Sequence, residues 1–370
     1  MNIGIVGCGK ISDIYLTNCH QRFSGTRVVA VADLLTEVAQ AKADQYGITR
    51  VLSVDELIAD SEVDAILNLT VPAAHAEICE KSILAGKHCY TEKPLSIDFA
   101  AGRRLVELAS EKRVRLGAAP DTFLGGGLQT VRKLVDDGWI GTPIAATAFM
   151  TSHGPEGWHP NPAFFYRRGA GPLFDMGPYY ITTLVSLLGP VKRLSAATRT
   201  TFAERVATTP ERYGEKIPVE VPTYVAGTLE FESGAIGTLV MSFDVWKSRL
   251  PRIDLFGELG SIGVPDPNTF GGPVELFRPG GEAWAEVPLS HGYSANSRGV
   301  GLLDMARAVE SGRPHRAAGE MSLHVLEVMH GLLESGETAS YYEMTTSCER
   351  PAPLPVGLND GEVDSAAPSR

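Results

Sequence analysis

The chain has 370 residues, of which 44% are hydrophobic and 21% are charged, a composition typical of globular proteins. This length exceeds what one small core needs and favours two domains. The 33 Lys and Arg residues against 44 Asp and Glu give a formal charge of −11. That balance argues against a nucleic-acid binder, which needs a basic surface. No run approaches the roughly 18 apolar residues of a membrane span, and no secretory leader is visible.

The five cysteines are scattered along the chain, and no Cys-x-x-Cys pair occurs. A disulfide framework or a structural zinc site would bring cysteines together at short, regular spacings. We therefore expect free thiols, no metal site and a cytoplasmic protein.

The first third of the chain alternates short apolar runs with helical patterns. Strands are predicted at residues 3–6, 28–32, 65–69, 88–91 and 115–118, and helices around 15–19 and at 35–46, 76–84 and 97–110. A further helix should begin after Ser53, because Ser53 and Glu56 have the spacing of a capping box. Strands that alternate with helices at this spacing indicate a parallel sheet wound on both faces.

A glycine turn joins the first strand to the first helix and has the sequence Gly7-Cys8-Gly9-Lys10-Ile11-Ser12. Glycines here let the backbone approach a pyrophosphate, which sits on the amides that open the helix. Asp33 ends the second strand, where a carboxylate accepts hydrogen bonds from the adenosine ribose and would repel a 2′-phosphate. We therefore expect a Rossmann domain that binds NAD rather than NADP. The expected cofactor contacts from this part of the chain are Gly7, Gly9, Lys10, Ile11 and Asp33.

Two further segments follow predicted strands at the edge where doubly wound sheets bind ligands. Residues 69–75 have the sequence Leu-Thr-Val-Pro-Ala-Ala-His, and residues 85–95 have Ala-Gly-Lys-His-Cys-Tyr-Thr-Glu-Lys-Pro-Leu. A lysine held beside a cofactor in a dry site can act on a hydroxyl proton. From its chemistry alone, however, Lys93 could equally be a surface lysine that neighbours Glu92.

These motifs together resemble the Gfo/Idh/MocA family of oxidoreductases, which includes glucose–fructose oxidoreductase and inositol dehydrogenase. The resemblance covers nearly the whole chain. It implies that Lys93 is the active-site lysine, and that Thr70, Pro72, His75 and Glu92 line the cofactor site together with Lys93.

The family's second signature is a glycine-rich segment that ends in Asp-x-Gly-x-His, and residues 169–179 resemble it. Asp175 aligns with the family's aspartate, whereas Tyr179 stands where many members have His. Tyr and Lys both have ordinary pKa values near 10, so the pair can share a proton relay, and which of them takes the substrate proton stays open. A second departure is the stretch 118–127, where many relatives have a polar, arginine-containing sequence.

Beyond residue 121 the regular alternation of predicted strands and helices ends. A helix is predicted at residues 130–137, strands at 144–150, 194–200, 223–231, 235–243, 253–256 and 274–277, and helical stripes around 305–309 and 323–330. Short turns such as Ser233-Gly234 favour a mostly antiparallel sheet. The resemblance supports a large open sheet with helices on one face and a partner subunit on the other, hence a homodimer or homotetramer.

The predicted domains are therefore a Rossmann domain at residues 1–121, a substrate-binding and oligomerisation α+β domain at 122–350, and an extended tail at 351–370. Between a strand and the second signature, a polar segment contains His153, Trp158, His159 and Arg167. Its functional interpretation is a substrate wall with Trp158 as a sugar-stacking platform, and the alternative is an ordinary surface loop. The histidine spacing matches no standard metal site.

The leading hypothesis is an NAD-dependent dehydrogenase that oxidises a secondary hydroxyl of a sugar, glycoside or cyclic polyol. Lys93 and Tyr179 would handle the hydroxyl proton, and Asp175 would orient Lys93 or bind the substrate. A second hypothesis is an NAD-dependent glycosidase that oxidises a glycoside transiently and then eliminates the leaving group. A third is an NAD-binding regulator without catalysis, against which the presence of Lys93 and Asp175 argues.

Overall fold

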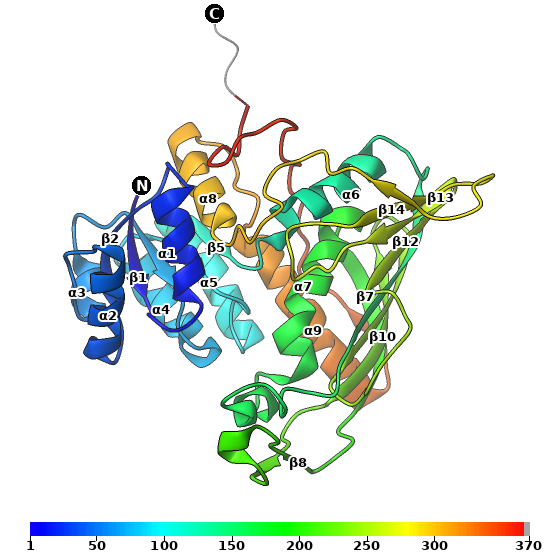
Figure 1. The fold of residues 1–370 in the computed structure, drawn as a ribbon, viewed down its shortest axis with the longest axis horizontal. Helices are drawn as coiled ribbons and strands as arrows, with labels where there is room; N and C mark the ends of the chain where they lie inside the picture. The colour runs from blue at the N-terminus through cyan, green and yellow to red at the C-terminus, as the bar shows by residue number, and fades with distance from the viewer. Residues whose placement is uncertain (366–370) are drawn as a thin grey trace, which may run out of the picture.

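The computed structural model describes residues 1–365 and places two sheets side by side, with helices between them (Figure 1). The first sheet has the strand order β2-β1-β3-β4-β5, and all its neighbouring strands are parallel. Its strands are β1 (Asn2–Val6), β2 (Arg27–Ala32), β3 (Ala65–Asn68), β4 (His88–Thr91) and β5 (Leu116–Ala118). The helices that accompany it are α1 (Ser12–Gln21), α2 (Thr36–Tyr46), α3 (Val54–Ala59), α4 (Pro72–Leu84) and α5 (Phe99–Lys112).

Both faces of this sheet are buried, as the prediction of a doubly wound fold requires. Alternate residues of a strand point to opposite faces. Accordingly, Ile3 and Ile5 belong to the core that includes Tyr15 of α1, whereas Val6 belongs to a separate core that includes Leu57 of α3. The predicted first domain is therefore confirmed as a Rossmann-like sheet.

Two predicted helix starts are informative, one that the structure matches and one that it does not. The capping box at Ser53 forms as expected, with Glu56 N–H donating to Ser53 Oγ and Ser53 N–H to Glu56 Oε2. Helix α4, in contrast, begins at Pro72 rather than at residue 76. A proline at the first helical position has no N–H to leave unpaired and already has a helical φ, so the proline starts the helix.

The second sheet has nine strands in the order β15-β14-β13-β12-β6-β11-β10-β7-β16, and only the β6–β11 pair is parallel. Its strands are β6 (Pro143–Thr151), β7 (Val191–Arg199), β10 (Tyr224–Phe231), β11 (Ile236–Ser242), β12 (Ile253–Gly257), β13 (Gly260–Val264), β14 (Val274–Phe277), β15 (Ala285–Val287) and β16 (Tyr342–Glu343). The remaining helices are α6 (Gly126–Asp136), α7 (Gly171–Leu188), α8 (Val300–Ser311) and α9 (Gly319–Thr338). The short strands β13, β15 and β16 were not predicted, since each has few apolar residues.

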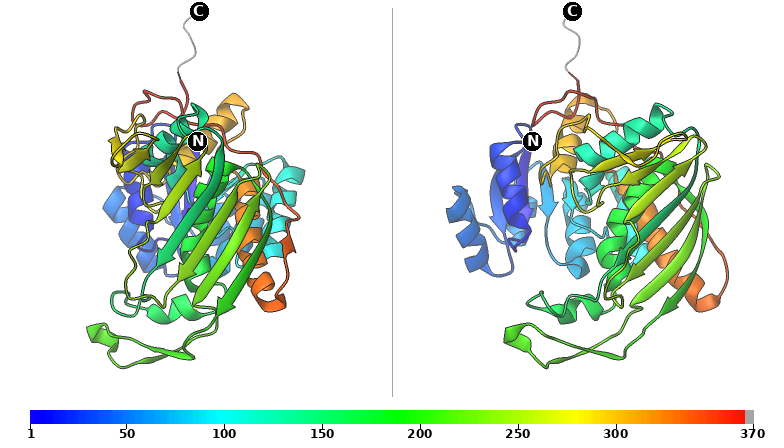
Figure 2. Two further views of the ribbon diagram at one scale, coloured as in Figure 1. Left: turned by 90° about the vertical axis from the view of Figure 1, so that its right-hand side faces the viewer. Right: turned by 45° about the vertical axis from the view of Figure 1, so that its right-hand side comes forward.

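Helices α7 and α9 cover one face of the second sheet, and the broad outer face carries no helix (Figure 2). After β15 the chain returns to the first sheet. Helix α8 packs on β5, and α9 packs on both α5 and β7. The division of the chain at residues 121 and 350 therefore stays a prediction. No helix within residues 1–365 is both long and apolar enough to cross a membrane.

The triple glycine Gly125-Gly126-Gly127 allows close packing of the start of α6. A Cβ at Gly125 would lie 2.6 Å from the Cα of Phe270, and one at Gly126 would lie 2.6 Å from the carbonyl oxygen of Gly292. Backbone atoms cannot move aside as a flexible side chain would. The stretch that departs from the family pattern thus serves helix packing, and α6 begins at Gly126, four residues earlier than predicted.

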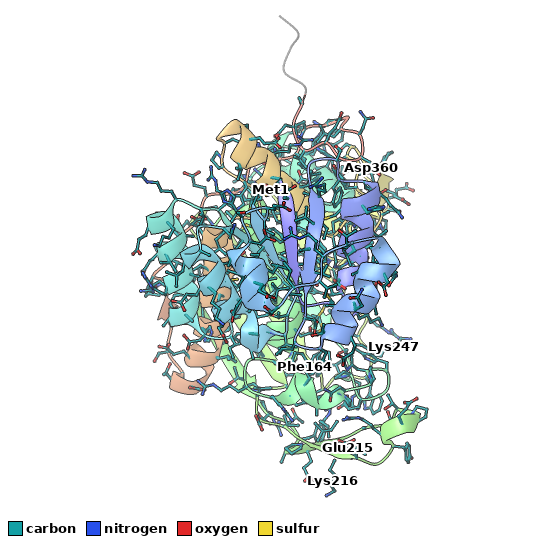
Figure 3. All side chains as sticks on the ribbon, turned by 90° about the vertical axis from the view of Figure 1, so that its left-hand side faces the viewer. Met1, Phe164, Glu215, Lys216, Lys247 and Asp360 are labelled. Carbon is teal, nitrogen blue, oxygen red and sulfur yellow. The ribbon has the colours of Figure 1, made fainter. Side chains whose placement is uncertain are left out.

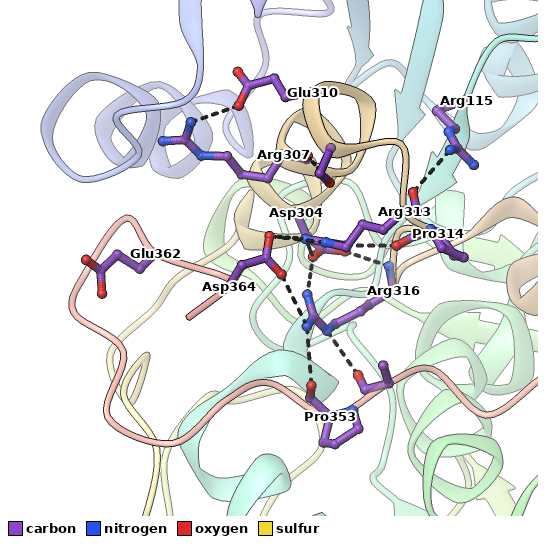
Figure 4. A network of polar contacts seen from close by, with 12 residues as sticks. Arg115, Asp304, Arg307, Glu310, Arg313, Pro314, Arg316, Pro353, Glu362 and Asp364 are labelled. Carbon is purple, nitrogen blue, oxygen red and sulfur yellow. Dashed lines mark hydrogen bonds and ion pairs between the residues drawn. The ribbon is translucent and has the colours of Figure 1, made fainter. Parts of the chain in front are cut away.

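The segment 351–365 forms no helix or strand and packs across α8. The predicted tail also includes residues 366–370, which lie outside the described part, so its extent stays a prediction. Asp304 of α8 is fully buried and binds the guanidinium groups of Arg313 and Arg316 (Figure 4). Arg316 also donates to two carbonyl oxygens of the tail, and Arg313 binds Asp364 at 2.8 Å. A buried carboxylate therefore anchors the tail through two arginines.

We expect Asp304→Ala to lower the free energy of unfolding by about 3 kcal/mol, because the buried Arg316 guanidinium loses its buried carboxylate partner and keeps only the more distant Asp364. Urea-induced unfolding measures the effect. Glu310→Ala is the matched control on the same helix: its carboxylate pairs with Arg307 at the surface, and its loss should cost less than about 0.5 kcal/mol. Equal effects of the two substitutions would show that the buried carboxylate does not anchor the tail.

Candidate active site

The glycine turn lies at the edge of the first sheet where the parallel strands end. Gly7 has a φ of +98°, and a Cβ at this position would lie 2.7 Å from the backbone of Leu69. A Cβ at Gly9, in contrast, would meet nothing within 4 Å. Gly7 is therefore needed for the turn itself, whereas Gly9 leaves open space above the backbone for a ligand.

The start of α1 has the features of an anion site. No side chain caps the helix, and the buried Ser12 closes the turn by donating from its hydroxyl to Gly9 O at 2.7 Å. The first amides of a helix carry partial positive charge and have no intrahelical acceptor. Lys10 and Ile11 are exposed beside them. A diphosphate fits this combination of free amides and an open glycine surface.

Asp33 lies beside the turn at the end of β2. Its carboxylate accepts hydrogen bonds from Cys8 N–H at 2.7 Å and from Leu35 N–H at 3.0 Å. Each carboxylate oxygen has a second lone pair, so both remain able to accept from ribose hydroxyls. The next residue, Leu34, is 95% exposed and offers no positive charge to a 2′-phosphate.

The start of α4 is connected to the lysine segment through His75. Its ring is fully buried, with Nδ1 2.7 Å from Pro94 O and Nε2 3.0 Å from Thr70 O. Burial lowers the pKa of His75, so a neutral ring at pH 7 donates to one of these carbonyls. The Thr70 hydroxyl is also engaged and donates to Asn68 Oδ1 at 2.7 Å. In the structure, His75 holds two loops together, and its ring contacts their backbones.

Lys93 follows β4, and two contacts fix its neighbour Glu92. Glu92 Oε1 accepts from the buried Tyr15 hydroxyl at 2.7 Å, and Glu92 Oε2 accepts from Lys93 N–H at 3.0 Å. The Lys93 ammonium crosses to the second sheet's helices and donates to Asp175 Oδ1 at 2.9 Å and to Asp175 O at 2.6 Å. Their side chains are 17% and 26% exposed, so the pair is open to a small ligand.

Asp175 and Tyr179 lie on one face of α7, because residues four apart are neighbours on a helix. The glycine-rich signature is thus largely helical, which sequence reasoning missed. Lys93 Nζ lies 5.3 Å from the centre of the Tyr179 ring. The structure therefore brings together the three side chains that the resemblance implies to be catalytic, Lys93, Asp175 and Tyr179.

The charges around this cluster favour a protonated lysine. Burial works against the Lys93 ammonium, but Asp175, Tyr179 and Glu92 together outweigh it, so the pKa of Lys93 is raised. Burial raises the pKa of Tyr179 as well, and Glu92 adds to this, while Lys93 and Arg298 oppose it. Lys93 thus holds its proton more firmly than a free lysine, and Tyr179 likewise keeps its proton to higher pH than a free tyrosine.

Arg298 is the site residue that sequence reasoning did not select. Its guanidinium donates to Asn296 Oδ1 at 2.9 Å and to Asn268 Oδ1 at 2.7 Å, and its positive charge acts to lower the pKa of Tyr179. It comes from the loop that precedes α8, more than a hundred residues away along the chain. Polar loops are ordinary in sequences, so only the packing of α8 against β5 reveals that this arginine faces the site.

The predicted substrate wall lies in the segment between β6 and α7. His153 stacks on Trp246 with ring centres 3.3 Å apart, and Trp158 packs edge-on against His159 while remaining 67% exposed. Arg167 is exposed. Among the described residues, no hydrogen bond, ion pair or ring contact connects these four side chains with Lys93, Asp175 or Tyr179, so their role in binding substrate stays a prediction.

This wall segment is anchored from below by a buried ion network. Arg205, which is 5% exposed, binds Glu156, Asp244 and the carbonyl oxygen of His153. Figure 3 shows Phe164 of this segment below the parallel sheet, with Glu215 and Lys216 at the far end of the neighbouring hairpin formed by β8 (Glu204–Val206) and β9 (Lys216–Pro218).

Within residues 1–365, no group of three or more His, Cys, Asp or Glu side chains is arranged to hold a metal ion.

Both halves of the chain match known families. Residues 1–119 match the family described as "Oxidoreductase family, NAD-binding Rossmann fold", and residues 128–263 match "GFO/IDH/MocA C-terminal domain". The inositol 2-dehydrogenase of Rhizobium meliloti (strain 1021) is 25% identical over 289 residues, which span 78% of this chain and 82% of that protein. The 1,5-anhydro-D-fructose reductase of Ensifer adhaerens is 28% identical over 349 residues, 93% and 98% of the two chains.

A solved structure of levoglucosan dehydrogenase in complex with NADH and L-sorbose superposes with a TM-score of 0.80 at 18% identity, covering 94% of this chain and 99% of that one. The likeness extends to both sheets and shows a shared fold. With its nucleotide-binding and C-terminal parts matching the same family, the protein belongs to the GFO/IDH/MocA oxidoreductases.

Proposed function

We propose that this oxidoreductase oxidises a secondary hydroxyl of a sugar, glycoside or cyclic polyol, with NAD as the electron acceptor. The observation that carries the proposal is the Lys93 ammonium held on Asp175 and beside Tyr179, at the edge of the sheet that presents the glycine turn. The names of the relatives support the substrate class, since they include an inositol dehydrogenase and an anhydrofructose reductase.

The residues of the first domain fit NAD. The open surface at Gly9 and the uncapped first amides of α1 suit the diphosphate, and the Asp33 carboxylate suits the ribose hydroxyls. When bound, NAD supplies the acceptor for the hydride that leaves the carbinol carbon.

The chain's own residues then bind the substrate hydroxyl and handle its proton. Lys93 stays charged on Asp175, so its ammonium donates a hydrogen bond to the substrate oxygen and keeps the carbinol oriented. Tyr179 faces the same space beside Lys93 and completes the relay through which the substrate proton leaves. In the reverse direction, the neutral Tyr179 hydroxyl returns this proton to the carbonyl oxygen.

We expect Lys93→Ala to lower kcat/KM for polyol oxidation at least about 10²-fold, because the substrate loses its donor and Asp175 loses its partner. Absorbance at 340 nm across free sugars, inositols and glycosides measures turnover. Lys133→Ala is the control, since Lys133 pairs with Asp137 at the surface of α6. Full turnover by Lys93→Ala on the best substrate would refute the assignment.

Product analysis on glycosides tests the glycosidase hypothesis, which requires free sugar without net NADH.

We expect Asp33→Asn to weaken NAD binding about 10-fold, because the ribose loses a charged acceptor while the side chain keeps its size. NADP binding should weaken less or improve, since repulsion of the 2′-phosphate is removed. Calorimetry with both nucleotides measures the change, with Asp44→Asn on the exposed face of α2 as the control. If NAD affinity is unchanged, Asp33 is not a cofactor contact.

We also propose a homodimer or homotetramer formed through the outer face of the second sheet. Residues of this face, such as Phe149 and Val240 on neighbouring strands, alternate with buried ones and lie on the side that no helix covers.

A cytoplasmic location is proposed as well, and the five free cysteines support it.

Light scattering should give two or four times the mass of one chain, and Val240→Lys should lower that mass, because a lysine would be buried in the subunit contact. Gln40→Lys on the exposed surface of α2 is the control and should leave the mass unchanged. A single-chain mass for the unmodified protein at micromolar concentration would overturn the oligomer proposal.

A further inference from the structure

Two cysteines that the proposed reaction does not use lie against each other in the core of the first domain. Cys79 belongs to α4 and Cys89 to β4, and both side chains are fully buried. The Cys89 thiol donates to Cys79 Sγ, with the two sulfur atoms 3.5 Å apart. Within residues 1–365, no hydrogen bond joins two other cysteines. The sulfur atoms of a disulfide are about 2 Å apart, so these two need to approach each other by about 1.5 Å to form one.

The two sulfur atoms have different surroundings. Cys79 Sγ accepts the Cys89 thiol and also the side-chain amide of Asn68, whose Nδ2 lies 3.5 Å away. Hydrogen bonds to a sulfur favour its thiolate form. The Cys89 thiol and, to a smaller extent, the Asn68 amide lower the pKa of Cys79 although burial opposes them, whereas the hydrogen bond to Cys79 and burial raise the pKa of Cys89. Cys79 is therefore the nucleophile of the pair, and Cys89 keeps its proton.

Asn68 connects Cys79 with the loop that precedes α4. The Asn68 side chain is fully buried, and its Nδ2 also donates to His75 O at 3.1 Å. Its Oδ1 accepts from the Thr70 hydroxyl at 2.7 Å and from Thr70 N–H at 3.3 Å. The family resemblance implies that Thr70 and His75 line the cofactor site. A change at the Cys79 sulfur therefore reaches this loop through a single buried amide.

The elements that carry the two cysteines also lead into the two segments that are expected to contact the cofactor. Helix α4 begins at Pro72, and β4 ends at Thr91, shortly before Lys93. The helix packs directly on the strand. Because a close-packed core cannot absorb the change locally, a bond that draws Cys79 toward Cys89 moves α4 against β4. Such a shift alters the spacing between the loop before α4 and the segment after β4.

We propose that Cys79 and Cys89 form a site of reversible oxidation, at which a peroxide converts the two thiols to a disulfide that weakens NAD binding. The effect on the cofactor rests on the proposed function. The Cys79 thiolate attacks one oxygen of hydrogen peroxide, the O–O bond breaks, and the products are a sulfenic acid and hydroxide, which takes the proton that Cys79 released. The Cys89 sulfur then attacks the sulfenic sulfur, the S–O bond breaks, and the hydroxyl leaves with the Cys89 proton as water. Two thiols are thus oxidised, and the peroxide is reduced to two molecules of water.

Burial controls how fast this reaction proceeds. Both sulfur atoms are closed off from solvent, so hydrogen peroxide reaches them when α4 opens locally. Reduction by a dithiol needs the same opening. A nucleotide bound on the loop before α4 opposes the opening, because a ligand that binds only the closed form stabilises that form. NAD should therefore slow the oxidation.

The first measurement follows the thiols of the full-length protein. After treatment with hydrogen peroxide and alkylation of the free thiols, trypsin cuts after Lys81 and Lys87 and so separates the two cysteines unless a disulfide joins their peptides. We expect one joined peptide pair, the loss of two of the five free thiols, and their recovery with dithiothreitol. Cys79→Ser should leave Cys89 alkylated, whereas Cys19→Ser, which removes a buried cysteine of α1, should still give the joined pair. Folded, peroxide-treated protein without a joined pair overturns the inference.

Calorimetry supplies the second measurement. The oxidised protein should bind NAD at least about 5-fold more weakly than the reduced protein, dithiothreitol should restore the affinity, and saturating NAD should slow the oxidation. Peroxide should not change the NAD affinity of Cys79→Ser or, if that variant does not fold, of Cys89→Ala. A disulfide that forms without changing NAD affinity overturns the inference. If the reduced protein binds NAD and responds to peroxide but oxidises no polyol, the proposed function fails while this inference stands.

Discussion

The site depends on the contact between Lys93 and Asp175, because this contact joins the Rossmann sheet to the helices of the second sheet. Lys93 follows a strand of the Rossmann sheet, and Asp175 lies on a helix that covers the second sheet. Both are partly withdrawn from water, which is costly for a single charge and acceptable for a hydrogen-bonded pair. The pair therefore aligns the two parts of the protein and at the same time keeps a charged donor in the space between them.

Contacts outside the site hold this alignment. Helix α9 packs on α5 of the first domain and on β7 of the second, and the tail is anchored on α8 through Asp304. The tail and the Rossmann domain together hold the loop that carries Arg298. Reacting groups must be held within fractions of an ångström for efficient hydride transfer. The buried polar network around α8 thus holds the tail and the loop before α8 against the first domain.

The glycines of the chain serve two different physical purposes. Gly7 adopts a φ that other residues avoid and approaches the backbone of Leu69, so it shapes the cofactor turn. Gly125 to Gly127 instead give α6 a surface without side chains, which lies directly against the backbone of neighbouring loops. The first use concerns the cofactor turn and the second concerns packing.

The sequence by itself determined the Rossmann domain and its strand and helix order, and the resemblance of its motifs to the family implied that Lys93, Asp175 and Tyr179 form a cluster. These features depend on local periodicity, on turn chemistry and on short motifs, all of which act over neighbouring residues. The tertiary structure alone decided that the second signature is a helix, which places Asp175 and Tyr179 on one face, and that this face meets Lys93 from the first sheet. Both depend on packing between segments far apart in the chain, and no local pattern encodes such a contact.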